Sequence, residues 1–267
     1  MKRKPIVAGQ FYPADPQQLE KYLEEVMPPG KEREYDAVGA MAPHAGYVFS
    51  GHVAAEVYSS MQPRDVYVVL APNHTGRGAR FAVGPEDYET PLGVAGIDRE
   101  LADSIMNRTA LLDYDAAAHA FEHSVEVQVP FIQKSFPETA IVPVVCQSGS
   151  MEEYSEIAGA LVKAISSSGK RVGILASSDM SHYESREKAG SLDSMALEKI
   201  ERFDAGGLIE VVTGRGISMC GYVPVAIMMM ASEGLGATEA KVLRYADSGD
   251  VTGDTAEVVG YAGAVIY

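Results

Sequence analysis

The sequence predicts an α/β fold, with a central, mostly parallel or mixed sheet flanked by helices. Three continuous apolar runs, at 38–42, 66–71 and 172–176, are typical of strands buried on both faces of a parallel sheet. Segments with helical spacing of apolar residues alternate with such runs, which is the order of elements in α/β proteins. No long Gly-, Ser- or Pro-rich linker divides the chain, so we expect residues 1–267 to form a single domain.

The first helices are predicted from their start and stop signals. Asp15 is an expected N-cap, and Pro16 suits the first helical position. Apolar residues then repeat at helical spacing until the Pro-Pro-Gly segment at 28–30 ends the pattern. A second helix is expected after the run at 38–42, with Ser50 as its N-cap.

The middle of the chain contains short extended segments and one buried strand. Segments 80–84 and 92–96 are flanked by Gly and Pro, so they predict edge strands or a hairpin. Asp98 begins a helix that extends to Asn107, and the run at 141–146 predicts another buried strand despite its proline.

The second half of the chain predicts three long helices and two final strands. Apolar spacing and flanking polar residues indicate helices at 152–167, 185–203 and 223–232. Two apolar segments, 241–246 and 258–267, predict the strands that complete the sheet.

The amino-acid composition limits which partners and which cellular compartment we expect for this protein. The 267 residues include 22 Lys and Arg against 37 Asp and Glu, a formal net charge of −15, which repels nucleic-acid phosphates and anionic lipids. The longest apolar stretch, 217–231, falls short of the ~20 residues that a membrane span needs. We therefore expect no nucleic-acid or membrane partner. Two cysteines and no recognisable signal peptide favour a reducing cytoplasm.

Each of the three buried runs ends in a loop that contains a histidine. His44 lies in the segment Pro-His-Ala-Gly, His74 in Pro-Asn-His-Thr-Gly and His182 in Ser-Ser-Asp-Met-Ser-His. Since ligand sites of such sheets lie outside the carboxyl ends of the strands, we expect these histidines to converge on one crevice. A single histidine of this kind is as easily explained by a hydrogen bond to a neighbouring carbonyl. Two in matching positions favour a metal or acid/base centre.

Two further motifs supply candidate residues for this crevice. Asp179 and His182 are three positions apart, so in a helical turn Asp179 would orient the imidazole; as an alternative, Asp179 is only a helix cap. The segment 119–123 matches the zinc-protease pattern H-x-x-E-H. Ser124, as a helix N-cap, would place both histidines before the helix, so a protease is disfavoured and His123 alone remains a candidate.

Cys220 precedes the methionine-rich helix and has two interpretations. A thiol at a helix N-terminus has a lowered pKa and can bind a metal. A free cysteine is more often a small buried apolar residue, and position alone favours that interpretation. Cys146, inside a predicted strand, is expected in the core.

Together, several segments resemble the Memo family, whose fold is similar to that of class III extradiol ring-cleavage dioxygenases (LigB-like). The matching segments extend over nearly the whole chain: Gly-Gln-Phe-Tyr-Pro (9–13), Ala-Pro-His-Ala-Gly-Tyr (42–47) with Ser-Gly (50–51), Asn-His (73–74), Glu-His-Ser-Val-Glu (122–126), Ser-Ser-Asp-Met-Ser-His-Tyr (177–183) and Met-Cys-Gly (219–221). The resemblance implies a single α/β domain with a pocket lined by these loops. It also implies two sets of site residues: the metal ligands His44, His74 and Cys220, and around them the candidate catalytic residues His123, Asp179 and His182.

The resemblance leaves three hypotheses about activity. The first is a metal-dependent redox or oxygenase-type enzyme in which His123 or His182 transfers a proton and Asp179 orients its histidine. Fe(II) is favoured, and Cu or Zn also suits a site containing a thiolate. The second is a non-catalytic module that binds a small molecule or a short, phosphotyrosine-type peptide in the same crevice. The third is a zinc hydrolase. The sequence specifies neither the substrate nor the oligomeric state.

Overall fold

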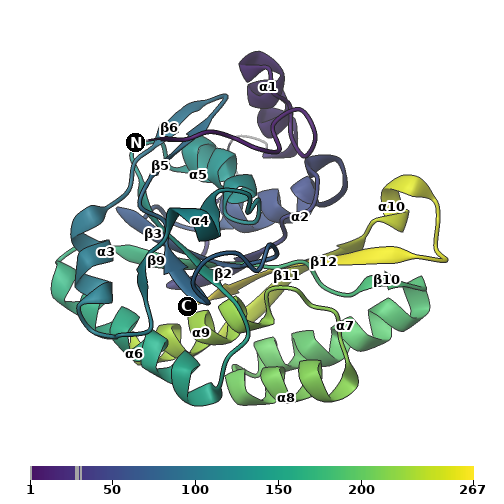
Figure 1. Cartoon of the computed structure of the whole chain (residues 1–267). Helices are drawn as coiled ribbons and strands as arrows, with labels where there is room; N and C mark the ends of the chain where they lie inside the picture. The colour runs from purple at the N-terminus through teal and green to yellow at the C-terminus, as the bar shows by residue number, and fades with distance from the viewer. Residues whose placement is uncertain (1, 28–29, 31) are drawn as a thin grey trace.

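A mixed β-sheet forms the centre of the molecule, and helices cover both of its faces (Figure 1). This computed structural model describes residues 2–27, 30 and 32–267. Within that part of the chain the main sheet has nine strands: in order, β10 (His182–Glu184), β12 (Val258–Ile266), β2 (Gly39–Ala42), β9 (Val172–Ser177), β3 (Val66–Pro72), β8 (Ala140–Cys146), β4 (Phe81–Val83) and β7 (Asp113–Tyr114), with β11 (Ala240–Asp247) beside β12.

The middle of the sheet is parallel and its margins are largely antiparallel. Strands β2, β9, β3 and β8 run in the same direction, with Ala42 opposite Ser177 and Leu70 opposite Ala176. Strand β12 runs antiparallel to β2, β10 and β11, and β4 runs antiparallel to β8. The predicted α/β class and the four buried strands are therefore confirmed, as are the two final strands.

Alternating side chains along the strands build one core on each face of the sheet. In β3, Val68 and Leu70 belong to one core, while Tyr67 and Val69 belong to the other. The first core is covered by α3 (Arg99–Met106), α6 (Met151–Ser168), α7 (Arg186–Glu201), α8 (Ala205–Arg215) and α9 (Tyr222–Gly234). The second is covered by α1 (Pro16–Val26), α2 (Tyr47–Ser60) and α5 (Val129–Ser135).

The remaining elements are short. A second sheet contains β1 (Lys2–Arg3), β5 (Asp87–Thr90) and β6 (Gly93–Ala95). Helices α4 (Ala116–His119) and α10 (Gly249–Thr252) and the 3₁₀ turn η1 (Glu126–Gln128) complete the described elements.

The helix-start predictions have mixed outcomes. Asp15 and Asp98 cap α1 and α3, each accepting a hydrogen bond from a backbone N–H three residues later. Pro28 and Pro29, expected to end α1, lie outside the described residues. Ser50 is not an N-cap: α2 begins at Tyr47, so Ser50 lies in its first turn and donates to the carbonyl of Ala45.

Two further features differ from the sequence prediction. Segments 80–84 and 92–96 do not pair with each other as a hairpin, because β4 joins the main sheet while β6 pairs with β5. The edge-strand alternative holds for β6, at the margin of its sheet, but not for β4, which lies between β8 and β7. Helix α8 was not predicted, since Gly206, Gly207 and Gly214 are poor helix formers. Its ends are nevertheless defined: Asp204 accepts from the N–H of Gly207, and Gly216 adopts a left-handed conformation that ends the helix.

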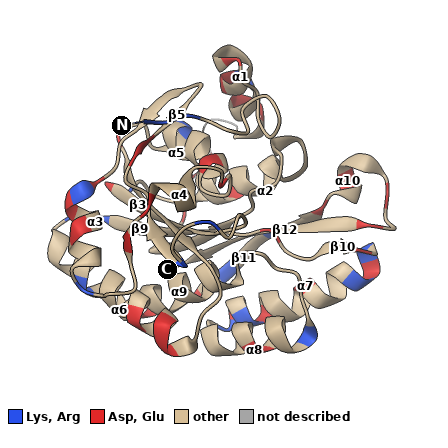
Figure 2. Cartoon of the chain, viewed as in Figure 1, with Lys and Arg blue, Asp and Glu red and all other residues tan. Residues whose placement is uncertain are grey.

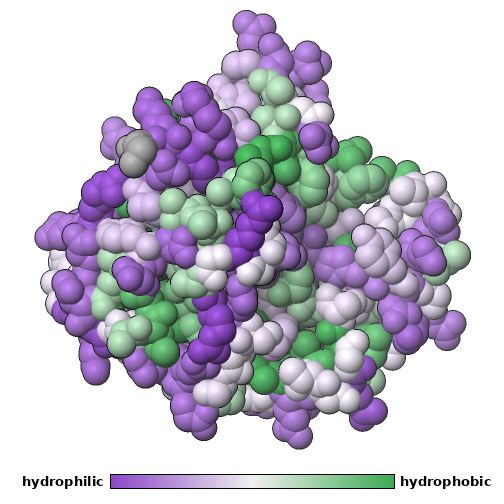
Figure 3. All heavy atoms as spheres, viewed as in Figure 1, coloured by the Kyte–Doolittle hydropathy of each residue, from purple (hydrophilic) through white to green (hydrophobic). Residues whose placement is uncertain are grey.

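Charged residues of both signs are spread over the outer helices (Figure 2). The space-filling view of the same face shows hydrophobic patches among predominantly hydrophilic residues (Figure 3). No helix in the described ranges combines the length and the hydropathy needed to cross a bilayer.

Candidate metal centre

Three neighbouring parallel strands carry candidate site residues at the same edge of the sheet. His44 follows β2 by two residues, His74 follows β3 by two, and Asp179 follows β9 by two. Because β9 lies between β2 and β3, the loops that follow these three strands lie side by side. The ring centroids of His44 and His74 are 5.2 Å apart.

His123 reaches this edge from the loop between α4 and η1. Its ring stacks on that of His74 at 5.0 Å between centroids and meets that of His44 edge-on at 5.5 Å. One ring nitrogen from each of the three histidines lies within 4.8 Å of the others. Imidazole nitrogens at these separations can hold a transition-metal ion. The sequence predicted His123 as an acid/base residue of the crevice. It did not predict His123 as a third metal ligand.

Cys220 lies beside the histidines, next to the first turn of α9. Its Sγ is 3.3 Å from Nε2 of His44 and accepts a hydrogen bond from the backbone N–H of Asp179 at 3.3 Å. Of the two interpretations of this residue, the one with a lowered pKa is not supported. Burial, and then the Asp179 carboxyl, raise the pKa of this thiol, so it is protonated in the metal-free protein.

The ring of His44 is buried and uncharged. Burial lowers its pKa well below the usual value, and the neighbouring rings of His74 and His123 lower it further. Its Nδ1 lies 2.9 Å from Oγ of Ser177. A neutral imidazole has one nitrogen with a free lone pair, which is the form that binds metals.

Glu122 holds the loop of His74. Its Oε1 is 2.9 Å from Nδ1 of His74, and its Oε2 accepts from the backbone N–H of the same residue. Burial alone would raise the pKa of Glu122, but hydrogen bonds from His74 and Ser124 outweigh it and lower this pKa to about 2. Because an ionised carboxylate can only accept, Nδ1 of His74 carries the proton and Nε2 is free to bind a metal.

Asp179 and His182 do not form the predicted pair. Oδ1 of Asp179 accepts from the backbone N–H groups of His44 and Ala45, at 2.8 and 3.2 Å, and so fixes the loop after β2. The ring of His182 is bound through Nδ1 to the carbonyl of Ser218. The predicted shared face is missing because the chain enters strand β10 at His182 and forms no helical turn there. Burial raises the pKa of Asp179 to about 6.

The two histidines of the H-x-x-E-H match point to separate places. His119 is buried in α4, with Nδ1 2.9 Å from the hydroxyl of Tyr88 and Nε2 3.0 Å from the carbonyl of Ala82. It therefore shares no helix face with His123, as the protease pattern would require.

A second buried carboxylate, Glu126, anchors the same loop through contacts that the sequence did not predict. Glu126 accepts from Nη1 of Arg3 at 2.7 Å and from the hydroxyl of Tyr12 at 2.7 Å. It also accepts from the backbone N–H groups of Ile6 and Val7. The N-terminal segment is thereby tied to the loop that presents His123. Arg3, far from this loop in sequence, has no local signal for that contact.

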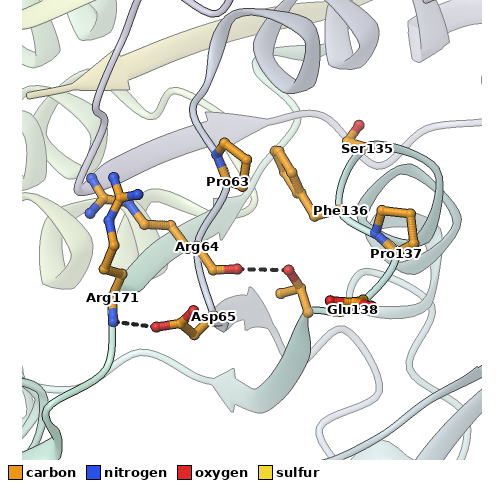
Figure 4. Close-up of a pocket in the computed structure, with 9 residues that line it drawn as sticks. Pro63, Arg64, Asp65, Ser135, Phe136, Pro137, Glu138 and Arg171 are labelled. Atoms are coloured by element: carbon orange, nitrogen blue, oxygen red, sulfur yellow. Dashed lines mark hydrogen bonds between the residues drawn. The ribbon is translucent and has the colours of Figure 1, made fainter.

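A separate cavity of about 600 Å³ lies at the opposite edge of the sheet, at the amino ends of β3, β8 and β9 (Figure 4). Two of its polar side chains are hydrogen-bonded within the protein: the carboxylate of Asp65 accepts from the backbone of Arg171, and Thr139 donates to the carbonyl of Arg64. The guanidinium groups of Arg64 and Arg171 both contact Asp36.

The fold and the histidine cluster together define an α/β protein with a candidate metal centre at the carboxyl edge of its sheet. Comparison with known proteins makes the assignment specific. The family description "Memo-like protein" matches residues 3–265, and the chain belongs to the Memo family.

Similar proteins support this assignment over the whole chain. A "MEMO1 family protein" of Methanosarcina mazei is 43% identical over 265 residues, which cover 99% of this chain and 98% of that protein. A MEMO1 family protein of Methanopyrus kandleri is 40% identical, with 99% of both chains covered. The crystal structure of the uncharacterized protein JW3007 from Escherichia coli K12 has a TM-score of 0.57 at 12% identity and covers 85% of this chain and 98% of its own. That likeness concerns the fold alone.

Proposed function

We propose that this Memo-family protein binds a metal ion, with Fe(II) favoured over Cu or Zn, and acts as a redox or oxygenase-type enzyme. The observation that carries the proposal is the set of three histidine nitrogens within 4.8 Å of one another, with the Cys220 thiol 3.3 Å from His44. A bound ion would supply Lewis-acid and redox chemistry at this edge of the sheet.

His44 and His74 are the two ligands that every version of the site shares. The third is either His123, which completes the histidine cluster, or Cys220, which the family resemblance implies. The thiol must lose its proton before it can bind an ion, so ligation by Cys220 releases a proton. Asp179 positions His44 through its backbone, and His182 or an unligated His123 is the proton-transfer group.

Metal analysis of tag-free protein after anaerobic loading with Fe(II) tests the centre. We expect close to one equivalent in the wild type and none in the double variant His44→Ala/His74→Ala. His52→Ala, a histidine of α2 outside the cluster, is the matched control and should bind as the wild type does. Stoichiometric binding in the double variant would refute the site.

Single variants identify the third ligand. If Cys220 ligates, Co(II)-loaded protein has a thiolate-to-metal charge-transfer band that Cys220→Ala removes and His123→Ala retains. If His123 ligates instead, the band is absent from the wild type and His123→Ala weakens Co(II) binding. Oxygen uptake by the Fe(II) protein with a panel of small aromatic diols then separates redox activity from zinc-type hydrolysis.

Binding of a short peptide or a small molecule without turnover is the second candidate function. Phe121 and Tyr183, next to the histidine loops, are 60% and 75% exposed, and exposed aromatic side chains are common in recognition surfaces. If protein supplied anaerobically with Fe(II) retains no metal, this binding function is favoured. Either function suits a reducing compartment such as the cytoplasm, where the Cys220 thiol persists.

A further inference from the structure

The hydroxyl of Ser177, at the end of β9, contacts three polar groups although it has only one hydrogen to donate. Its Oγ is 2.9 Å from Nδ1 of His44, 2.8 Å from Nε2 of Gln128 and 2.8 Å from the carbonyl of Ser124. All four residues are buried, so no bulk water can replace a missing partner. The direction of each hydrogen bond is therefore restricted by the others.

The amide of Gln128 has a defined orientation. Its Oε1 accepts from the hydroxyl of Tyr58 at 2.9 Å, and its Nε2 faces the carbonyls of Ala42 and Pro43 at 3.3 and 2.9 Å. Carbonyl oxygens only accept, so the atom that faces them is the NH₂ group. Gln128 is consequently a donor to Ser177, and the hydroxyl hydrogen must point elsewhere.

Two acceptors compete for that hydrogen: the Ser124 carbonyl and, in one tautomer, Nδ1 of His44. If Ser177 donated to His44, the buried carbonyl of Ser124 would lose this hydrogen bond, which is unfavourable for a carbonyl that water cannot reach. If Ser177 donates to Ser124, its Oγ accepts from an Nδ1–H of His44 and every group is paired. The second arrangement is favoured.

We propose that Ser177 and Gln128 are positioning residues that keep His44 in the Nδ1–H tautomer. The Nε2 lone pair then faces Sγ of Cys220 at 3.3 Å, ready to accept from the thiol or to bind an ion. Glu122 imposes the same tautomer on His74. The effect that this tautomer would have on metal affinity rests on the proposed function. The assignment of the tautomer of His44 does not depend on metal binding.

Long-range ¹H–¹⁵N spectra of metal-free protein with ¹⁵N-labelled histidine test the tautomer directly, with His44→Asn used for assignment. We expect the proton on Nδ1 of His44 in the wild type and a shift towards Nε2 in Ser177→Ala. Ser60→Ala removes another buried hydroxyl that donates one hydrogen bond, at the far end of α2, and should leave the His44 signals unchanged. A proton on Nε2 in the wild type overturns the proposal even if Ser177→Ala does not fold. An unchanged tautomer in folded Ser177→Ala also overturns it.

Zn(II) titration of the same proteins tests the consequence. We expect Ser177→Ala to bind about 10–100-fold more weakly than the wild type, because an orienting partner of the ligand is lost. Ser60→Ala should bind like the wild type. Equal affinity in Ser177→Ala would refute the positioning role. A wild type that binds no metal would refute the proposed function, while the spectra would still decide the tautomer.

Discussion

Glu122 holds His74 at two points: Oε1 lies 2.9 Å from the ring Nδ1, and Oε2 accepts from the backbone N–H. The same carboxylate accepts from the N–H of Ser124 and lies 3.6 Å from Nδ1 of His123. One buried acidic group thus fixes the loop of His74 and also lies beside the ring of His123.

Replacing Glu122 by Gln should weaken metal binding while preserving the shape of the side chain. An uncharged amide binds Nδ1–H less strongly, so we expect a loss of about 10–100-fold in Zn(II) affinity by isothermal titration calorimetry. Glu89→Gln alters a glutamate outside the cluster and serves as the control. Equal affinities for Glu122→Gln and the wild type would argue against an orienting role.

The buried ion pair between Arg3 and Glu126 should contribute strongly to stability. Removing one partner leaves an uncompensated buried charge or several unpaired donors, so Arg3→Met or Glu126→Gln should lower the free energy of unfolding by about 3–5 kcal/mol. Urea titration measures the change. Lys4→Met breaks the neighbouring, exposed pair with Glu89 and should have little effect. Similar losses for the buried and exposed pairs would contradict this expectation.

His119 should make the protein sensitive to acid. Burial lowers its pKa to about 4, with the Ala82 carbonyl acting in the opposite direction. Arg3 also lowers this pKa, while Glu122 and Asp115 raise it; the phenol of Tyr88 hydrogen-bonds Nδ1. A pKa below the unfolded value of about 6.5 means that the unfolded chain binds the proton more readily.

The stability contributed by neutral His119 is therefore present above pH 6.5 and is lost as the pH falls through about 4. The loss over that window is about 3 kcal/mol, from 1.36 kcal/mol per pKa unit. His119→Gln, which retains a donor and an acceptor but does not titrate, should show a shallower decline. Urea unfolding of both proteins at several pH values measures the difference, and parallel curves would contradict the prediction.

Close packing around Gly221 should make it intolerant of a side chain. A Cβ at this position would collide with the carbonyl of Ser177 and the side chain of Ser178. We expect Gly221→Ala to lower the free energy of unfolding by about 1–3 kcal/mol and to displace the adjacent Cys220. Gly159→Ala, at an open position in α6, should be stabilising by about 0.5–1 kcal/mol. Thermal denaturation of the two variants tests the contrast.

The strand-end histidines were predictable because they depend on a repeated local pattern. A buried apolar run predicts a central strand, and neighbouring parallel strands bring their following loops together, as happens for His44 and His74. The Pro143 in β8 did not disturb the prediction, since the flanking residues are uniformly apolar.

Other parts of the site depend on contacts that no local pattern specifies. His123 lies in an irregular loop whose position is set by Arg3 and Glu126, more than one hundred residues apart. The partner of Asp179 is a backbone group 135 positions away, and helical spacing to His182 suggested the wrong one. The Ser177–Gln128 contact likewise joins residues on two elements, so only the folded arrangement reveals it.

His44 and Cys220, whose side chains touch, are 176 positions apart in the sequence. During synthesis the ribosome releases the histidines long before the thiol and α9, so the full set of candidate donors exists only after most of the chain has emerged. An ion that requires all of these donors would bind the completely folded protein and would not bind a partly synthesised chain. At a free concentration one hundred times its dissociation constant, it would add about 2.7 kcal/mol to the apparent stability. The availability of the ion would then influence how much of the newly made protein survives.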